Sequence, residues 1–173
     1  MWFTGLSGAG KTTVANVVEA ELEQRGHVVD HLDGDIVRTH LSKGLGFSKE
    51  DRDENIQRIG WVASRLARAG AAVIVSAISP YEAARRRVRA LVELHAPFIE
   101  VYVATPLEEC ARRDPKGLYA AAFAGEISDF TGVSAPYEEP ANPEVRIDTT
   151  GMSPSDSAQV VLERLEQLAV TQV

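Results

Sequence analysis

The stretch "GLSGAGKT", Gly5–Thr12, decides how this chain can fold. It fits the pattern G-x-x-x-x-G-K-[ST], with glycines at Gly5 and Gly10 followed by Lys11 and Thr12. The glycines let the backbone curl so that successive N–H groups point at one anion, and the following helix adds its positive end. The lysine of such a loop reaches the β- and γ-phosphates of a nucleoside triphosphate, and the hydroxyl binds Mg²⁺. The stretch therefore predicts a phosphate-binding loop (P-loop).

Apolar runs and helical patterns alternate along the rest of the chain. The run "AAVIVSAI", residues 71–78, is continuously apolar, as expected of a strand buried on both faces of a parallel sheet. The predicted strands are residues 1–4, 27–33, 71–78, 98–104 and 145–150, and the predicted helices are residues 11–24, 35–41, 48–69, 80–95, 106–113 and 153–168. This order predicts an α/β fold of the P-loop NTPase type, a three-layer sandwich with a central parallel sheet and a lid segment.

The segment 114–143 breaks the alternation. It is rich in glycine, proline and small residues, so we expect a mobile lid over about residues 114–137 rather than a core element. At its edge, "RRDPKGLY" supplies Arg112, Arg113 and Lys116 as a clamp on a nucleotide or on an acceptor. The alternative is that these residues form only a charged loop.

The composition limits the classes of partner. The 173 residues are 45% hydrophobic and 25% charged, with a net charge of −7, and we expect one domain over residues 1–173. Nucleic acids and anionic membranes favour basic proteins, so we expect neither as the main partner. No apolar run approaches the roughly 20 residues of a membrane span, and the N-terminal residues lack a signal-peptide pattern. Cys110 is the single cysteine, which favours a reducing, cytoplasmic location.

A GTPase is one alternative for a chain with this loop. The tetrad "DFTG", Asp129–Gly132, imitates a switch motif, but it lies in the predicted lid and not at a strand end. The guanine-reading pattern Asn-Lys-x-Asp is absent from the sequence. A short chain with an early P-loop and a late lid fits a small-molecule kinase better.

Two acidic residues follow the second predicted strand, where an acceptor would lie. Within "DGDIVR", Asp33 and Asp35 could hold Mg²⁺ through water or take a proton from an attacking hydroxyl, and Arg38 follows them. The alternative is a loop and a helix cap, since Asp35 would also cap the helix predicted after it. The residues alone leave both interpretations open.

The helix predicted from Ser48 carries two polar side chains near its start. Arg52 and Asn55 are three residues apart and share one face, where a guanidinium and an amide suit a phosphate, a sulfate or the edge of a base. The alternative is a solvated polar face behind Ser48 as the N-cap.

A possible capping box follows the third predicted strand. In "ISPYEAARR", Ser79 and Glu82 have the spacing of a capping box, with Pro80 at the first helical position. A capping role accounts for Ser79 without any nucleophile.

Together, the blocks "GLSGAGKTT", "DGDIVR", "LGFSKEDRDENIQRI", "ISPY", "RDPKGLY" and "FTGVSAPYEEP" resemble the adenylylsulfate kinase (APS kinase) family. The resemblance runs from Trp2 to about Glu144, and the order and spacing of the later blocks make it specific. It implies an ATP-dependent kinase of sulfate assimilation. Such a kinase transfers the γ-phosphate of ATP, with Mg²⁺, to the 3′-hydroxyl of adenosine 5′-phosphosulfate (APS) and forms PAPS and ADP.

The resemblance also implies residues for two substrate sites. The implied ATP-binding residues are Gly5, Leu6, Ser7, Gly8, Ala9, Gly10, Lys11, Thr12, Thr13 and Arg113. The implied APS-binding residues are Asp35, Arg38, Phe47, Arg52, Asn55, Ile78, Ser79, Lys116 and Phe130. Phe47 and Phe130 would sandwich the adenine, because stacking holds a flat base without unpaired polar groups.

The expected mechanism is direct transfer. Lys11, Mg²⁺ and the amides of the P-loop stabilise charge on the moving phosphoryl group. Asp35 is expected to orient or deprotonate the 3′-hydroxyl, while Thr12 and, through water, Asp33 hold the metal ion. Ser79 occupies the family's phosphoserine position and is included among the catalytic candidates on that resemblance alone.

Some features depart from the family pattern. Ile36 stands where the family commonly has asparagine, and alanines and Phe123 stand where basic lid residues are frequent. The resemblance further implies a homodimer with ATP and APS as substrates.

Two other functions stay open at this point. One is a P-loop kinase for a different small hydroxyl acceptor, and the other is a catalytically weak nucleotide-binding module. The intact Lys11, Thr12, Asp33 and Asp35 argue against the weak module.

Overall fold

In the computed structural model, which describes residues 1–170, five parallel strands form one sheet in the order β2-β3-β1-β4-β5. The strands are β1 (Trp2–Thr4), β2 (Val29–Asp33), β3 (Ala72–Ser76), β4 (Glu100–Val103) and β5 (Val145–Ile147). The central strand β1 pairs with β3 on one side and with β4 on the other. Because all strands run in the same direction, their carboxyl ends meet along one edge of the sheet.

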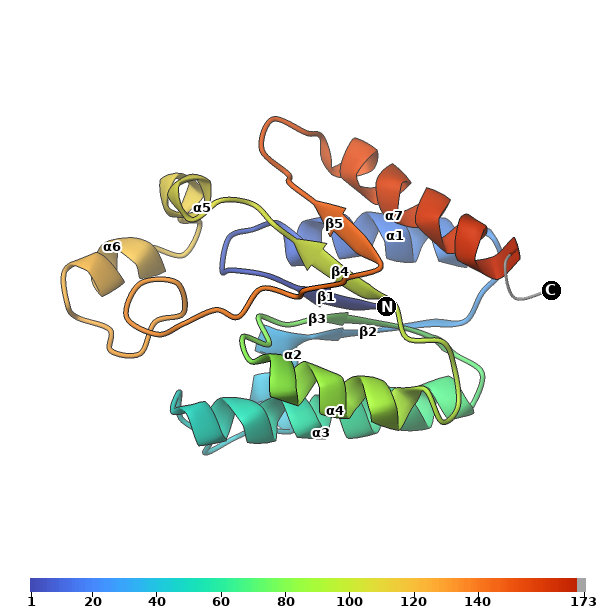
Figure 1. Ribbon diagram of the computed structural model, residues 1–173, viewed down its shortest axis with the longest axis horizontal. Coiled ribbons are helices and arrows are strands. Elements are labelled where there is room, and N and C mark those ends of the chain that lie inside the picture. The colour runs from blue at the N-terminus through green and yellow to red at the C-terminus, as the bar shows by residue number, and fades with distance from the viewer. Residues whose placement is uncertain (171–173) are drawn as a thin grey trace.

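Helices cover both faces of this sheet, so the predicted three-layer α/β fold is confirmed (Figure 1). α1 (Lys11–Gln24) and α7 (Pro154–Val170) pack on one face, and α3 (Lys49–Arg68) and α4 (Glu82–Val92) pack on the other. α2 (Gly34–His40) follows β2, while α5 (Leu107–Arg113) and α6 (Leu118–Phe123) lie beyond the carboxyl edge. Within residues 1–170, no helix combines the length and the apolar character that crossing a membrane requires.

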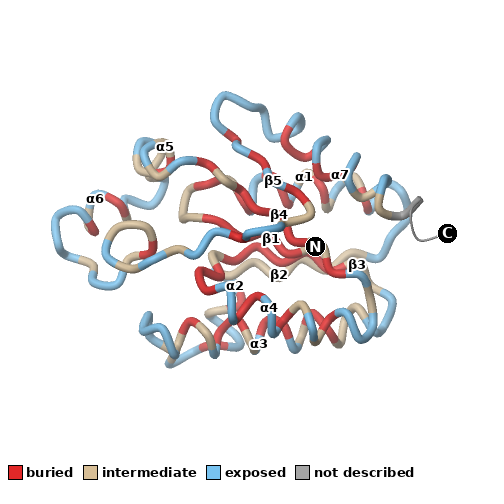
Figure 2. The backbone as a smooth tube through the Cα atoms, viewed as in Figure 1, coloured by how far each residue is buried: buried red, intermediate tan, exposed pale blue. Residues whose placement is uncertain are grey.

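Two apolar clusters, one on each face of the sheet, form the core. Successive side chains of a strand point to opposite faces, so Phe3 packs with α1 and α7 whereas Trp2 packs with α3 and α4. Figure 2 shows burial concentrated in β1, β3 and β4 and the helices beside them, while the loop after α6 is largely exposed. The sheet is therefore a packed platform, and the loops at its carboxyl edge are free to carry a site.

The predicted lid contains an ordered helix, α6, which the sequence analysis did not predict. Alanines, the residues of highest helix propensity, make up half of it, and the carboxylate of Asp114 accepts hydrogen bonds from the N–H groups of Tyr119 and Ala120, each at 3.0 Å. Tyr119 is buried in the core, and its hydroxyl donates to the carbonyl oxygen of Ser7 at 2.9 Å. The prediction of a segment without a core element was therefore wrong at Tyr119, which fastens the lid to the P-loop.

The start of α2 differs from the prediction. Asp33, and not Asp35, caps this helix: its carboxylate accepts from the N–H groups of Asp35 at 2.9 Å and Ile36 at 3.4 Å. Asp35 therefore has no capping duty and projects from the first turn. By contrast, Ser48 caps α3 as predicted, accepting from the N–H of Asp51 at 3.1 Å.

The start of α4 also differs, because the predicted capping box does not form. The helix begins at Glu82, and the Ser79 hydroxyl donates to the carbonyl oxygen of Ala77 at 3.3 Å instead of capping it. The carboxylate of Glu138, at the far end of the lid, accepts from the N–H of Glu82 at 2.7 Å. Glu138, which lies 56 positions after Glu82 in the sequence, therefore caps the helix in place of Ser79.

Candidate active site

Most of the predicted site residues meet around one cavity of about 600 Å³ at the carboxyl edge of the sheet. The P-loop, α2, the start of α3 and several residues of the predicted lid all contribute to its lining. The predicted residues in its lining are Ser7, Gly8, Gly10, Lys11, Thr12, Thr13, Asp33, Asp35, Arg38, Phe47, Arg52, Asn55, Ile78, Ser79, Arg113, Lys116 and Phe130.

A few predicted residues lie outside this lining. Gly5, Leu6 and Ala9 belong to the P-loop but do not line this cavity, and Ala9 is fully buried. Arg112 is exposed and pairs with Glu109 on its own helix, so the suggested clamp does not include it.

The P-loop depends on two glycine conformations. Gly5 has a φ of 146°, and a Cβ there would lie 2.5 Å from the carbonyl oxygen of Val103. Gly10, directly before α1, has a φ of 101°, a value that other residues rarely adopt. Glycine therefore lets the chain pass close to β4 and turn into a helix whose N-terminus faces the cavity, which is the geometry of an anion-binding loop.

Lys11 extends its ammonium back over the P-loop. Nζ donates to the carbonyl oxygens of Gly5 at 3.0 Å and Leu6 at 2.8 Å. Burial lowers the pKa of Lys11 to about 8, because the charged form loses its hydration. The carbonyl oxygens compensate the charge only in part, so an anion in the cavity would stabilise it.

Nucleotide binding is expected to take up protons at pH 8. With the pKa of Lys11 near 8 in the free chain, roughly half of the ammonium groups are deprotonated at that pH, and a neighbouring phosphate raises the pKa again. Calorimetric titration with Mg²⁺–ATP in two buffers of different ionisation heat measures this uptake directly. The uptake should shrink at pH 7, and equal binding heats in both buffers at pH 8 would contradict the prediction.

Thr12 and Asp33 offer oxygen ligands for a metal ion. The Thr12 hydroxyl donates to the Asp33 carboxylate at 2.8 Å. Partial burial opposes ionisation of Asp33, but the hydrogen bonds from Thr12 and from two backbone N–H groups outweigh it and lower the pKa of Asp33. Mg²⁺ is usually held by one or two protein oxygens while phosphates and water complete its octahedron. The pair therefore fits a nucleotide-bound Mg²⁺ ion.

Asp35 and Lys116 form an ion pair between α2 and the lid. Both side chains are more than half exposed, and exposed pairs contribute only about 0–1 kcal/mol. A more highly charged ligand can therefore replace either partner, so the lid meets Asp35 through a contact that a substrate could break.

Arg38 and Arg52 flank the ring of Phe47, with their guanidinium carbons 4.4 and 5.5 Å from its centroid. Burial lowers the pKa of both guanidinium groups. Arg52 also donates to the carbonyl oxygen of Phe47 at 2.8 Å, to Thr131 Oγ1 at 3.0 Å and to the carbonyl oxygen of Asp129. It therefore joins α3 to the lid, and the alternative of a solvated polar face is wrong for Arg52.

Asn55 contributes to the cavity lining, and its side chain is buried. Its Oδ1 has no hydrogen-bond partner among the residues that the structure describes. Leaving a buried amide oxygen unpaired costs about 1–3 kcal/mol. Because the side chain is buried, Asn55 is also not part of a solvated face.

Arg113 connects the P-loop region to the end of β5. Nη1 donates to Thr149 Oγ1 at 2.8 Å and Nη2 donates to the Thr149 carbonyl oxygen at 3.0 Å. The sequence analysis missed Thr149, whose hydroxyl also donates to the carbonyl oxygen of Ala9 at 2.9 Å. The position of Thr149 in the sequence could have indicated this role. Thr149 comes shortly after β5, at the edge of the sheet where the P-loop lies.

Ser79 lies in the cavity wall with its hydroxyl engaged on both sides. Oγ accepts from Trp2 Nε1 at 3.0 Å and donates to the carbonyl oxygen of Ala77. The residue is buried and has a φ of 41°, which is uncommon without glycine. These contacts hold the turn after β3 and present Ile78 to the cavity.

Two of the departures from the family pattern, Ile36 and Phe123, lie on the surface. Their side chains are each 62% exposed, and neither residue belongs to the cavity lining.

The charge of the cavity is opposite to that of the whole chain. Five cationic side chains line it (Lys11, Arg38, Arg52, Arg113 and Lys116) against two acidic ones (Asp33 and Asp35), in a chain of net charge −7. Such an excess concentrates anions. The P-loop fold, with a cationic, aromatic-rimmed pocket facing the loop, defines a P-loop kinase with an anionic acceptor.

Comparison with known proteins gives the family. A protein-family model described as adenylylsulphate kinase matches residues 1–148. An adenylyl-sulfate kinase of Picosynechococcus sp. is 54% identical over 97% of this chain and 93% of its own length. This chain therefore belongs to the adenylylsulfate kinase family, and the resemblance seen in the sequence is confirmed.

Solved structures agree with this assignment. The Mycobacterium tuberculosis APS kinase in complex with AMPPNP and APS is similar with a TM-score of 0.90 and 48% identity, covering 95% of both chains. A hexameric APS kinase from Thiobacillus denitrificans has a TM-score of 0.74 and 41% identity, covering 96% of this chain and 28% of that one.

Proposed function

We propose that this chain transfers the γ-phosphate of Mg²⁺–ATP to the 3′-hydroxyl of APS, with PAPS and ADP as products. The observation that carries the proposal is that one cavity is lined by the P-loop and also by Arg38, Arg52 and Lys116 together with the rings of Phe47 and Phe130. APS combines a flat base with a phosphosulfate group of high charge, which matches stacking rings and guanidinium groups.

ATP is expected to occupy the P-loop end. The amides of Gly5–Thr13 and the ammonium of Lys11 would surround its phosphates, and Arg113 would lie beside the nucleotide. The lowered pKa of Lys11 supports this placement, because a phosphate relieves the cost of its buried charge.

Thr12 and, through water, Asp33 are the residues expected to hold Mg²⁺. When bound, the ion neutralises charge on the β- and γ-phosphates and on the transferring group. The hydroxyl and carboxylate already lie 2.8 Å apart, which supports their sharing one ion.

Asp35 is expected to orient the 3′-hydroxyl and to accept its proton. The new bond forms between the acceptor oxygen and the γ-phosphorus as the bond to the departing ADP oxygen breaks. In the free chain the Asp35 carboxylate is paired with Lys116. A bound phosphosulfate would attract Lys116 and release Asp35 for this role.

Transfer is expected to be direct rather than through a phosphoserine. Ser79 matches the family's phosphoserine position, but its buried hydroxyl is engaged by Trp2 and Ala77. Residues 114–137 would close over the substrates and exclude water, which otherwise competes as the acceptor.

The test is a coupled assay of ADP release from Mg²⁺–ATP with and without micromolar APS, with the nucleotide product identified. APS-dependent ADP release matched by PAPS is the expected result. Turnover with a different small hydroxyl compound and not with APS would point to another P-loop kinase. Nucleotide binding without any turnover would leave a weak nucleotide-binding module.

Assembly and location are part of the same proposal. We expect residues 1–173 to act as one kinase domain in a cytoplasmic homodimer, which sedimentation analysis checks directly; residues 171–173 lie outside the described part of the chain. The free thiol of Cys110 is buried, which is compatible with a reducing compartment.

A further inference from the structure

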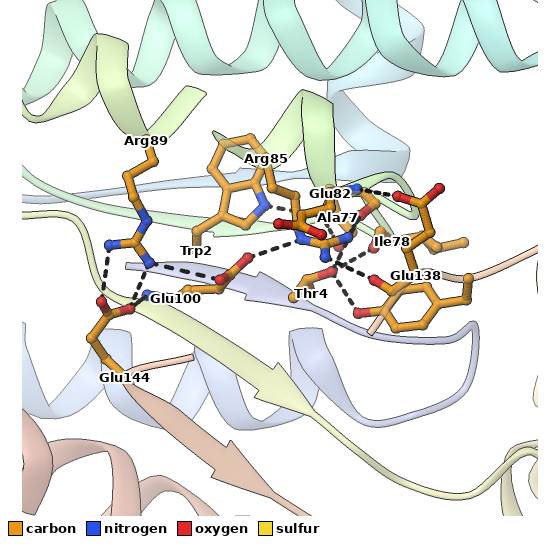
Figure 3. A network of polar contacts seen from close by, with 12 residues as sticks. Trp2, Thr4, Ala77, Ile78, Glu82, Arg85, Arg89, Glu100, Glu138 and Glu144 are labelled. Atoms are coloured by element: carbon orange, nitrogen blue, oxygen red, sulfur yellow. Dashed lines mark hydrogen bonds and ion pairs between the residues drawn. The ribbon is translucent and has the colours of Figure 1, made fainter. Parts of the chain in front are cut away.

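A buried arginine in α4 connects a turn in the cavity wall to the far end of the lid, two segments that are far apart in the sequence (Figure 3). The guanidinium of Arg85 is only 2% exposed. Nε donates to Glu100 Oε1 at 2.9 Å, Nη1 to the carbonyl oxygen of Ser79 at 2.8 Å, and Nη2 to the carbonyl oxygen of Glu138 at 2.7 Å. One side chain therefore holds both the turn after β3 and the end of the lid.

A second bridge runs parallel to the first. The Thr4 hydroxyl donates to the carbonyl oxygen of Ile78 at 2.7 Å and lies 2.8 Å from the Tyr137 hydroxyl. Because the single hydroxyl proton of Thr4 is used on Ile78, Tyr137 is the donor to Thr4. Each lid residue, Tyr137 and Glu138, is thus tied through one side chain to the carbonyl of a cavity-wall residue.

Backbone contacts complete the connection. The N–H of Glu138 donates to the carbonyl oxygen of Pro80 at 2.8 Å, and the Glu138 carboxylate caps α4 at Glu82. Thr4, Arg85, Tyr137 and Glu138 together are called the lid anchor below.

The lid anchor joins two segments that both contribute to the cavity lining. Ile78 and Ser79 belong to one of them, and Phe130 and Thr131, a few residues before the anchored end of the lid, belong to the other. Ser79 has a φ of 41°, a strained value that persists only where neighbouring contacts impose it. Those contacts include the Arg85 hydrogen bond to its carbonyl oxygen.

We propose that Arg85 is a positioning residue for the acceptor site, fixing the turn at Ile78–Ser79 and the returning end of the lid relative to each other. The inference rests on the proposed function only for the identity of the acceptor. Arg85 lies outside the cavity lining and is expected to act through Ser79 and Glu138, without touching either substrate.

Arg85→Lys is the variant that tests this role. It keeps a positive charge beside Glu100, but one ammonium on a flexible chain cannot reproduce the fork that reaches three acceptors. Misplacing a wall of the site should raise the KM for APS by about tenfold, while the KM for ATP changes by less than about twofold.

Arg89→Lys is the matched control. Arg89 lies one turn further along α4 and pairs with Glu144 at 2.8 Å and with the same Glu100 at 3.7 Å. Among the residues that the structure describes, Arg89 makes no hydrogen bond or ion pair with the cavity lining or the lid, so the same substitution there should leave both KM values nearly unchanged. The proposal would be overturned if the two variants changed the KM values equally, or if Arg85→Lys raised the KM for ATP as much as the KM for APS. Arg85 would then have only a structural role.

Amide hydrogen exchange gives a readout that needs no substrate. Arg85→Lys should accelerate exchange at Glu138 and in residues 76–80 together, whereas Arg89→Lys should not. Tyr137→Phe, which removes one donor and keeps the ring, should produce a smaller change in the same segments. Unchanged exchange in Arg85→Lys would overturn the lid anchor. If Arg85→Lys accelerates exchange in both segments but the parent protein shows no APS-dependent turnover, the lid anchor stands and the proposed acceptor is rejected.

Discussion

Lys11→Ala is expected to abolish phosphoryl transfer, lowering kcat by about 10³-fold or more. Lys11 is the cation that we expect beside the phosphates, and its removal would leave the charge of the moving phosphoryl group to the metal ion and the backbone amides. Single-turnover measurement of ADP formation at saturating ATP and APS would establish the loss of the chemical step. Near-normal turnover in the variant would reject the P-loop mechanism.

Lys11→Met is the control for this experiment, because it retains most of the side-chain shape without the charge. The lowered pKa of Lys11 means that the folded chain disfavours the charged form. This penalty is fully present below about pH 8 and disappears as the pH rises through the range between the folded pKa and the value of 10.5 typical of an unperturbed lysine. The methionine variant should therefore be at least as stable at pH 7 as the parent. Its phosphoryl transfer should nevertheless be as low as that of Lys11→Ala. Thermal unfolding separates these two effects.

Arg52→Ala is expected to raise the dissociation constant of APS by about 10- to 100-fold and to leave that of ATP nearly unchanged. A hydrogen bond to a charged group contributes about 1.5–3 kcal/mol, and Arg52 lies at the acceptor end of the cavity. The loss has two sources, because Arg52 supplies positive charge and also holds the lid through Thr131 and Asp129. Equilibrium titrations with each ligand separately would measure the two constants.

Arg52→Lys distinguishes the two sources. Lysine keeps the charge but cannot hold Phe47, Thr131 and Asp129 at once. If its APS affinity lies close to that of the alanine variant, the lid contacts dominate; if it approaches that of the parent, the charge dominates. Equal losses for ATP and APS in Arg52→Ala would remove the residue from the acceptor site.

The features that the sequence predicts correctly are local ones. Gly5–Thr12 encode the P-loop within eight consecutive residues, since the turn needs glycine conformations and the helix begins at once. The continuous apolar runs likewise predict a parallel sheet covered on both faces, as found. Ser48 caps α3 by accepting from the N–H of Asp51, only three positions further along the chain. Each of these depends on neighbours in the chain, so a short window contains the needed information.

Most of the wrong or undecided predictions concern contacts between distant segments, and the cap of α2 is the local exception. Arg52 and Asn55 could form a solvated face in their own helix, but both are buried, and Arg52 donates to Thr131 and Asp129 of the lid. Ser79 has the spacing of a capping box, but Trp2 engages its hydroxyl from 77 residues away and Glu138 caps the helix in its place.

Sequence alone determined the nucleotide loop, the parallel α/β fold and, through the resemblance of its motif blocks, the family. The tertiary structure decided which polar groups are buried together and how Arg85 joins the lid to the cavity wall. The physical reason is the same in each case. A buried hydrogen-bonding group takes whichever partner the fold brings within reach, and local spacing does not determine that partner when the competing groups come from opposite ends of the chain.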